Sequence, residues 1–83
     1  MSENTGDVRA LIEQVAKALV DAPDAVIVTQ LEEGGTTVIE LEVSPEDMGK
    51  VIGKSGRTAR AMRNLVGAVG MKSNRHVELE ILE

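Results

Sequence analysis

The segment Val51-Ile52-Gly53-Lys54-Ser55-Gly56-Arg57 sets two glycines three positions apart between two stretches of helical spacing. Glycine lacks a Cβ atom, so Gly53 and Gly56 can take positive φ and let another backbone approach closely. A helix that follows such a turn points unpaired amide groups and its positive dipole end at that approach, which suits a phosphate. A glycine turn can also serve geometry alone. The motif therefore indicates an anion site only when its surroundings agree.

The chain before the motif predicts one helix and a β-hairpin. From residue 7 to about 21, apolar residues recur with the i, i+3, i+4, i+7 spacing of one helix face, and Pro23 should end that helix. Residues 25–31 and 36–43 are rich in β-branched residues and flank the turn residues 32–35. In the second strand the outward-facing positions are largely acidic, so one face should be apolar and the other wet.

The chain after the hairpin predicts two helices and a last strand. Ser44-Pro45-Glu46-Asp47 has the pattern of a helix start, with a hydroxyl cap and proline at the first helical position. Helical spacing resumes from Arg57 to Val69, a polar loop follows over 71–75, and apolar residues alternate again over 77–81. The order is α-β-β-α-α-β. This predicts an α+β fold in which three helices cover one face of a three-stranded sheet.

Length and residue usage restrict the function classes. With 83 residues we expect a flexible terminus over 1–6 and a single domain over 7–83. The chain has no cysteine and one histidine, which argues against a disulfide framework, a zinc site or any other metal cofactor. No apolar run approaches the roughly 18 residues of a membrane helix, and the first residues lack the order of a secretory signal. We therefore expect a soluble, cytoplasmic protein without cofactor.

Charge is strongly segregated along the chain. The net charge of -5 argues by itself against nucleic acid, because phosphate binding rests on lysine and arginine. However, the stretch 48–77 contains no acid and holds seven of the nine basic residues, namely Lys50, Lys54, Arg57, Arg60, Arg63, Lys72 and Arg75. This segregation indicates one basic surface on an acidic body, and a merely solvated helix face is the alternative.

Two chemical alternatives fit the sequence poorly. Gly53-Lys54-Ser55 is similar to the end of a nucleotide-binding P-loop, but Gly49 and Gly53 are separated by three residues where that motif needs four, and it should follow a strand. An enzyme needs a nucleophile with a base, or a metal. The serines have only His76 as a histidine partner, which is better explained as a surface residue, so we expect no catalysis.

The complete absence of aromatic residues separates classes of RNA-binding domain. RRM and OB modules stack bases on aromatic side chains, which this chain does not possess. A domain that grips the nucleic-acid backbone and contacts bases through aliphatic side chains has no such requirement. If the basic surface binds a single strand of nucleic acid, the lack of aromatic stacking predicts weak, salt-sensitive binding with little sequence selectivity.

In this context the chain resembles the KH domains of RNA-binding proteins, in the type II arrangement, and especially the small bacterial KhpA-like family. The resemblance covers about residues 7–83 and is carried by Ala16-Lys17-Ala18-Leu19-Val20, Ser44-Pro45-Glu46-Asp47, Gly49-Lys50-Val51-Ile52-Gly53-Lys54 and Gly56-Arg57-Thr58-Ala59. One departure is the pair Gly67 and Gly70, which we expect to loosen the end of the last helix.

The resemblance implies a clamp in which the GxxG loop holds the backbone of about four nucleotides of single-stranded RNA. It implies that the phosphates follow Gly53, Lys54, Ser55 and Gly56, and that the last strand forms the other groove wall. The remaining implied RNA contacts are Val51 and Ile52 lining the groove, Arg57, Thr58 and Arg60 flanking the path, and Lys50 and Arg63.

For the cellular role, the resemblance implies an RNA chaperone or post-transcriptional regulator that works with a KhpB-like KH protein. Members of this family are associated with self-assembly and with bacterial cell elongation and division, hence with cell shape. The alternative is therefore a protein-interaction module, such as a homodimer, in which RNA binding is secondary.

Overall fold

A computed structural model gives the architecture of the protein and describes residues 6–83. Its main elements are α1 (Gly6–Leu19), β1 (Ile27–Glu33), β2 (Thr36–Glu42), α2 (Met48–Ile52), α3 (Arg57–Lys72) and β3 (His76–Ile81). Three short 3-10 turns occupy Pro23–Ala25, Pro45–Asp47 and Lys54–Gly56. The predicted order α-β-β-α-α-β is confirmed, and the first helix begins at Gly6, inside the stretch predicted as a flexible terminus. The rest of that terminus, residues 1–5, lies outside the described residues.

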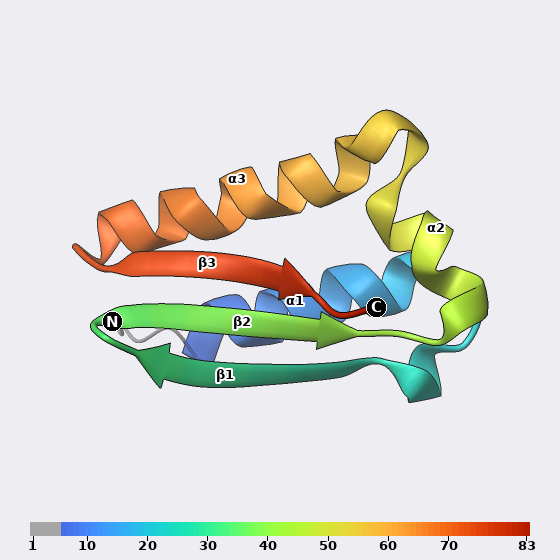
Figure 1. The fold of residues 1–83 in the computed structure, drawn as a ribbon, viewed down its shortest axis with the longest axis horizontal. Helices are drawn as coiled ribbons and strands as arrows, with labels where there is room; N and C mark the ends of the chain where they lie inside the picture. The colour runs from blue at the N-terminus through green and yellow to red at the C-terminus, as the bar shows by residue number, and fades with distance from the viewer. Residues whose placement is uncertain (1–5) are drawn as a thin grey trace.

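The three strands form one mixed sheet in the order β1-β2-β3. The hairpin makes β1 and β2 antiparallel, with Gln30 opposite Ile39. The chain then crosses over through α2 and α3, so that β3 lies parallel to β2 with Leu79 opposite Ile39 (Figure 1). This crossover leaves β3 at the edge of the sheet next to α3.

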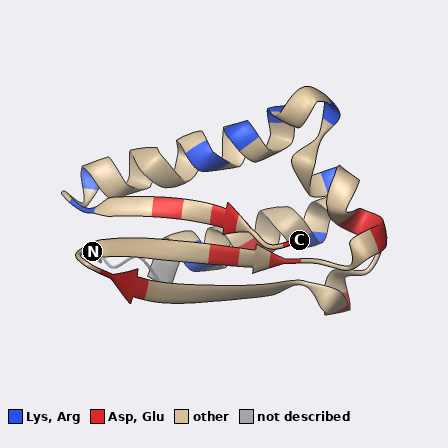
Figure 2. Cartoon of the chain, viewed as in Figure 1, with Lys and Arg blue, Asp and Glu red and all other residues tan. Residues whose placement is uncertain are grey.

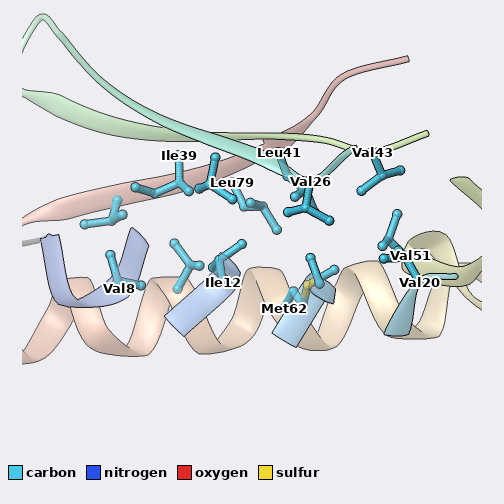
Figure 3. Close-up of a cluster of buried hydrophobic side chains, with 14 residues drawn as sticks. Val8, Ile12, Val20, Val26, Ile39, Leu41, Val43, Val51, Met62 and Leu79 are labelled. Carbon is cyan, nitrogen blue, oxygen red and sulfur yellow. The ribbon is translucent and has the colours of Figure 1, made fainter. Parts of the chain in front are cut away.

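The core lies between one face of the sheet and the helices, as Figure 3 shows. Helix α1 supplies Val8, Ile12 and Ala16, and Val20, which directly follows the helix, continues their four-residue spacing as a single apolar stripe. The sheet supplies alternate residues of each strand, because side chains along a strand point to opposite faces. The expectation that the helices cover one face of the sheet is confirmed.

The opposite face of the sheet carries several acidic residues from β2 and β3, two strands on which Figure 2 marks the acids in red. Glu40 of β2 stands directly opposite Glu80 of β3, and Glu42 and Glu78 lie on the same face. Like charges opposite each other on neighbouring strands weaken pairing, so the Glu40–Glu80 pair does not stabilise the sheet. This face also repels phosphates, which leaves the helical side of the molecule as the side open to an anion.

The end of α3 differs from the sequence-based prediction. The helix passes through Gly67 and Gly70 and ends at Lys72, so the predicted loop 71–75 shrinks to 73–75. Gly70 is buried against the start of β3: a Cβ atom there would lie 2.9 Å from the Arg75 carbonyl oxygen and 2.9 Å from Val77 Cγ2. This glycine therefore permits close packing of α3 on β3 and does not loosen the helix.

The start of α2 also differs. The Ser44 hydroxyl makes no capping bond to the helix and instead donates to Glu46 Oε1 at 2.6 Å. That hydrogen bond, more than any other contact, lowers the pKa of the Glu46 carboxyl. Pro45 begins a 3-10 turn, and α2 itself starts only at Met48.

Among residues 6–83, no helix is long and apolar enough to span a membrane.

Candidate nucleic-acid interface

The loop between α2 and α3 has a backbone that only glycine fits at its first position. Gly53 has φ +79° and ψ 168°, and its N–H donates to the Gly49 carbonyl at 2.9 Å, which closes α2. A Cβ atom at Gly53 would lie 2.7 Å from Thr58 Cβ, 2.8 Å from Thr58 N, and closer still to the Thr58 hydroxyl. Both the dihedral angles and the contact with α3 therefore require glycine here.

The second glycine is required only by conformation. Gly56 has φ +74° and donates its N–H to the Gly53 carbonyl at 3.0 Å, whereas an added Cβ would meet nothing closer than Arg60 Nη2 at 3.9 Å. Ser55, between them, also has positive φ, +57°. Three of the four loop residues, Gly53, Ser55 and Gly56, therefore have positive φ, and the chain turns sharply between the two helices. Its exposed members Lys54 and Ser55 stand at the surface.

Basic residues lie at this loop and continue along α3 (Figure 2). Lys54, Arg57, Arg60 and Arg63 are exposed, and within residues 6–83 none of them forms an ion pair. The Arg60 guanidinium also donates to the Ser55 carbonyl at 3.3 Å, which braces the loop against the first turns of α3. The predicted basic surface is thus a set of four unpaired cations next to the loop.

Two other bases of the basic stretch are engaged elsewhere. Arg75 donates to Glu32 Oε1 at 3.3 Å and to the buried Thr37 hydroxyl at 3.1 Å, which fastens the α3–β3 loop to the hairpin. Lys50, a predicted RNA contact, lies 3.4 Å from the Asp21 carboxylate and 3.6 Å from that of Asp47. The hydrogen bond and charge of Asp21 are the main causes that raise the pKa of Lys50. Its position indicates a structural ion pair.

The Asp47 carboxylate anchors α2 to the rest of the fold. Its side chain is buried and accepts the Ala22 N–H at 3.0 Å, from the segment that follows α1. Burial raises the pKa of this carboxyl, but the backbone hydrogen bonds from Ala22 and Asp21 and the nearby Lys50 outweigh it, so the pKa is lowered. Because α2 has only five residues, this contact largely fixes where the glycine loop stands.

The two apolar residues before the loop differ in position. Val51 is fully buried in the core and points away from the surface, so its side chain does not line a groove as the family resemblance implied. Ile52 is half-buried next to the loop. Helical geometry explains the difference, since consecutive residues of a helix point about 100° apart and only one of the two can face the core.

A groove runs between α3 and the edge strand β3. Its part nearer the loop is a hollow of about 310 Å³ lined by Arg63, Val77, Glu78 and Leu79. A larger hollow of about 480 Å³ follows toward the end of α3 and is lined by Arg63, Asn64, Gly67, Ala68, Met71, Arg75, His76 and Val77. Arg63, which the sequence places among the RNA contacts, thus lies where the two hollows meet.

The sequence reasoning missed the residues of the second hollow. Asn64 and Met71 lie on α3 and carry no motif, and only the packing of α3 on β3 brings them next to the strand. His76, interpreted as a surface residue, is exposed and lies 3.0 Å from the Glu78 carboxylate. Within the described part of the chain, no three His, Cys, Asp or Glu side chains gather as metal ligands would.

The chain was compared with solved structures and shares a fold with a domain of Era. An Aquifex aeolicus Era variant bound to GDP and AlF4- has a TM-score of 0.57 and 19% identity, over 89% of this chain and 29% of that one. Era in complex with MgGDPNP and nucleotides 1506–1542 of 16S ribosomal RNA has a TM-score of 0.58 and 21% identity, over 89% and 28%. This chain spans less than a third of Era, and the likeness concerns the fold.

Sequence comparisons are more specific. RNA-binding protein KhpA of Halalkalibacterium halodurans is 51% identical over 75 residues, which cover 90% of this chain and 99% of that protein. RNA-binding protein KhpA of Caldanaerobacter subterraneus is 53% identical over 72 residues, covering 87% and 96%. That of Aquifex aeolicus is 53% identical over 73 residues, covering 88% and 92%. A family model described as KhpA/KhpB, KH domain matches residues 9–81, and the chain therefore belongs to this family of KH-domain proteins.

Proposed function

We propose that this protein binds single-stranded RNA through its glycine loop, which clamps the backbone of about four nucleotides while bases enter the groove between α3 and β3. The observation that carries the proposal is the loop itself. Residues 53–56 form a sharp turn with positive φ at Gly53, Ser55 and Gly56. Four cations that form no ion pair with another described residue lie in the turn or follow it on α3, namely Lys54, Arg57, Arg60 and Arg63. A phosphate chain can approach the backbone at Gly56 closely, because no side chain stands there and the nearest atom to the position of a Cβ is 3.9 Å away, whereas Thr58 fills the corresponding space beside Gly53.

The comparisons support the same ligand. The curated relatives at about half identity are named RNA-binding proteins, and one structure with the same fold holds Era together with a segment of 16S ribosomal RNA. Every position of the loop, Gly53, Lys54, Ser55 and Gly56, lies inside the stretch that the family model matches. The ligand proposed for this chain thus agrees with the names of its relatives and with the chemistry of its loop.

The side chains around the loop have distinct proposed roles. Lys54, Arg57 and Arg60 neutralise phosphates, and Arg63 reaches the bases from the groove. Ser55 and Thr58 offer hydroxyl donors next to the backbone path, and Ile52 lines the groove at its loop end. Val51 supports the loop from the core, and Lys50 holds α2 in place through Asp21 and Asp47.

Binding of this kind should be weak and sensitive to salt. Aromatic stacking, which contributes about 1–3 kcal/mol per base in other single-strand binders, is absent because the chain has no aromatic residue. The acidic face of the sheet adds long-range repulsion. What remains is a short, backbone-directed contact with little preference for sequence.

The test replaces Lys54 and Ser55 together by Asp and measures binding to single-stranded RNA tetramers by NMR titration. A matched control replaces Lys17 and Ala18, exposed on α1, by Asp and changes the net charge by the same amount. We expect the loop variant to lose binding at least tenfold relative to this control. Equal binding by the two variants would exclude the clamp, since only long-range charge would then matter.

We also propose that the protein acts as an RNA chaperone or post-transcriptional regulator together with a KhpB-like KH protein. The support is that one family model covers the KH domains of both KhpA and KhpB. Purified protein should form a complex with its organism's KhpB-like protein in sedimentation velocity runs. A mixture that sediments as two separate species would reject this partnership.

A second proposal is self-association, with RNA binding secondary to it. The favouring observation is apolar exposure, since Leu11, Ile27 and Leu65 are 38%, 54% and 38% exposed. Sedimentation of wild type and of the Lys54/Ser55 variant, each with and without RNA, separates the roles. Assembly that survives the loop variant is independent of the clamp, and a monomer at every concentration tested would reject self-association.

A further inference from the structure

Gly67 lies in the middle of α3 without a structural reason for being glycine. Its φ is not positive, and a Cβ atom added there would meet nothing within 4 Å. Gly70, one turn later, is different because it permits the close contact between α3 and β3. Glycine in a helix interior is less stable than alanine, so position 67 carries a cost that neither conformation nor packing requires. This points to a use for the space beside it.

That space is the larger hollow of the α3–β3 groove. A side chain at position 67 would extend into its volume of about 480 Å³, between Arg63 and Met71 on α3 and His76 and Val77 on β3. The hollow joins the one nearer the loop at Arg63. Gly67 lies eleven positions after Gly56, which corresponds to about 16 Å along the axis of α3. The groove therefore continues well past the loop.

The lining of the hollow fits a nucleobase. None of the described residues that line it is acidic. Arg63 and Asn64 form no side-chain hydrogen bond or ion pair within residues 6–83, so both can bond the edge of a base. Met71 is 81% exposed, and its thioether is suited to contact with a flat ring. Because the protein has no aromatic residue, a bound base would supply the ring for this contact.

We propose that the hollow beside Gly67 accepts one unstacked base of an RNA strand held at the glycine loop, as a subsite outside the four-nucleotide clamp. This inference rests on the proposed function. A strand held at the loop next meets the unpaired Arg63 along α3, and the missing side chain at position 67 leaves room for its base. A protein segment is the competing occupant, and the length dependence of RNA binding distinguishes the two.

The test compares Gly67→Leu, which fills the hollow, with Gly67→Ala, which adds one methyl group. Both replace glycine by a better helix former with free space around it, so both should raise the Tm by about 4 °C or more. The probes are single-stranded tetramers and octamers of uridine, adenosine and cytidine. Amide signals of the protein are followed by NMR during each titration.

We expect Gly67→Leu to weaken octamer binding at least fivefold relative to Gly67→Ala, and to leave tetramer binding unchanged. In the wild-type protein, the Gly67 amide signal should move with octamers and stay with tetramers. The proposal is overturned if Gly67→Leu and Gly67→Ala bind octamers equally, or if tetramers shift Gly67 as strongly as octamers do. If the Lys54/Ser55 variant still binds tetramers normally, it is the clamp itself that fails.

Discussion

Gly53→Ala should destabilise the protein far more than Gly56→Ala, although both glycines have positive φ. At Gly53 the φ of +79° with ψ 168° lies in a region almost confined to glycine, which costs another residue about 1–3 kcal/mol. The new Cβ would also lie 2.7 Å from Thr58 Cβ, and relieving such an overlap costs about 1–3 kcal/mol more. We expect a total near 4 kcal/mol.

Gly56→Ala meets only the first kind of cost. Its φ of +74° with ψ 15° is left-handed helical, where a side chain costs about 1–2 kcal/mol, and the nearest atom to a new Cβ is 3.9 Å away. For a domain of this size, 1 kcal/mol corresponds to about 4–8 °C in Tm. The two variants should therefore differ in Tm by roughly 8 °C or more, measured by circular dichroism.

The double variant Gly53→Ala/Thr58→Gly isolates the contact. It removes the Thr58 side chain from the overlap, so a double-mutant cycle in urea should show about 1–2 kcal/mol of coupling between the two positions. Coupling within 0.3 kcal/mol of zero (about the limit of additivity), or equal losses for Gly53→Ala and Gly56→Ala, would show that the loop does not press against α3 as described.

Two further predictions concern the anchor of α2 and the packing of α3 on β3. The folded-state pKa of Asp47 is lowered, so this carboxylate stabilises the fold at pH values above its ordinary pKa of 3.8, and the stabilisation is lost as pH falls through the folded-state pKa. Urea unfolding should therefore show a smaller loss of stability below pH 5 for Asp47→Asn than for the wild-type protein. Gly70→Ala should lower the Tm despite alanine's better helix propensity, because its Cβ would lie 2.9 Å from the Arg75 carbonyl oxygen. Gly67→Ala, with free space around it, should raise the Tm. If both variants shifted the Tm in the same direction, the argument that Gly70 is needed for packing would be refuted.

Element order and the loop could be predicted from sequence because both depend on local patterns. The stripe of apolar residues in α1 and the alternation in β3 each specify a period, and the two glycines of the loop mark a turn. The element boundaries that differ from the sequence-based prediction, such as the end of α3 at Lys72, are those set by tertiary contacts. From the sequence alone, Gly70 is interpreted as a residue that weakens the helix. Only the fold shows that it lies against β3 and permits close packing there.

The candidate site was predictable by residue type but not by availability. The basic stretch is visible in the sequence, yet Lys50 is paired with Asp21 and Asp47, and Arg75 with Glu32. Asp21 and Glu32 are far from their partners in the chain, Glu32 by 43 positions, so no local pattern could reveal these two pairs, whereas Asp47 lies only three positions before Lys50. Val51 is a similar case, because one residue of helical rotation separates the core from the surface.

This pairing limits how strongly RNA binding can depend on salt. With Lys50 and Arg75 held in ion pairs, at most five cations of the basic stretch can neutralise phosphates, namely Lys54, Arg57, Arg60, Lys72 and, where it does not contact a base, Arg63. Single strands give a slope of log Kobs against log salt of about -0.7 for each neutralised phosphate, so the slope should be no steeper than about -3.5. Titrations of wild type, Arg57→Gln and Lys50→Gln at several salt concentrations measure it.

Arg57→Gln should make this slope shallower by about 0.7, whereas Lys50→Gln should leave it unchanged. Lys50→Gln should instead lower the Tm, because it leaves the buried Asp47 carboxylate without a cation next to it. A wild-type slope well beyond -3.5, or a change of about 0.7 on losing Lys50, would mean that RNA draws Lys50 out of its pair with Asp21. The anchor of α2 and the binding of phosphate would then compete for the same side chain.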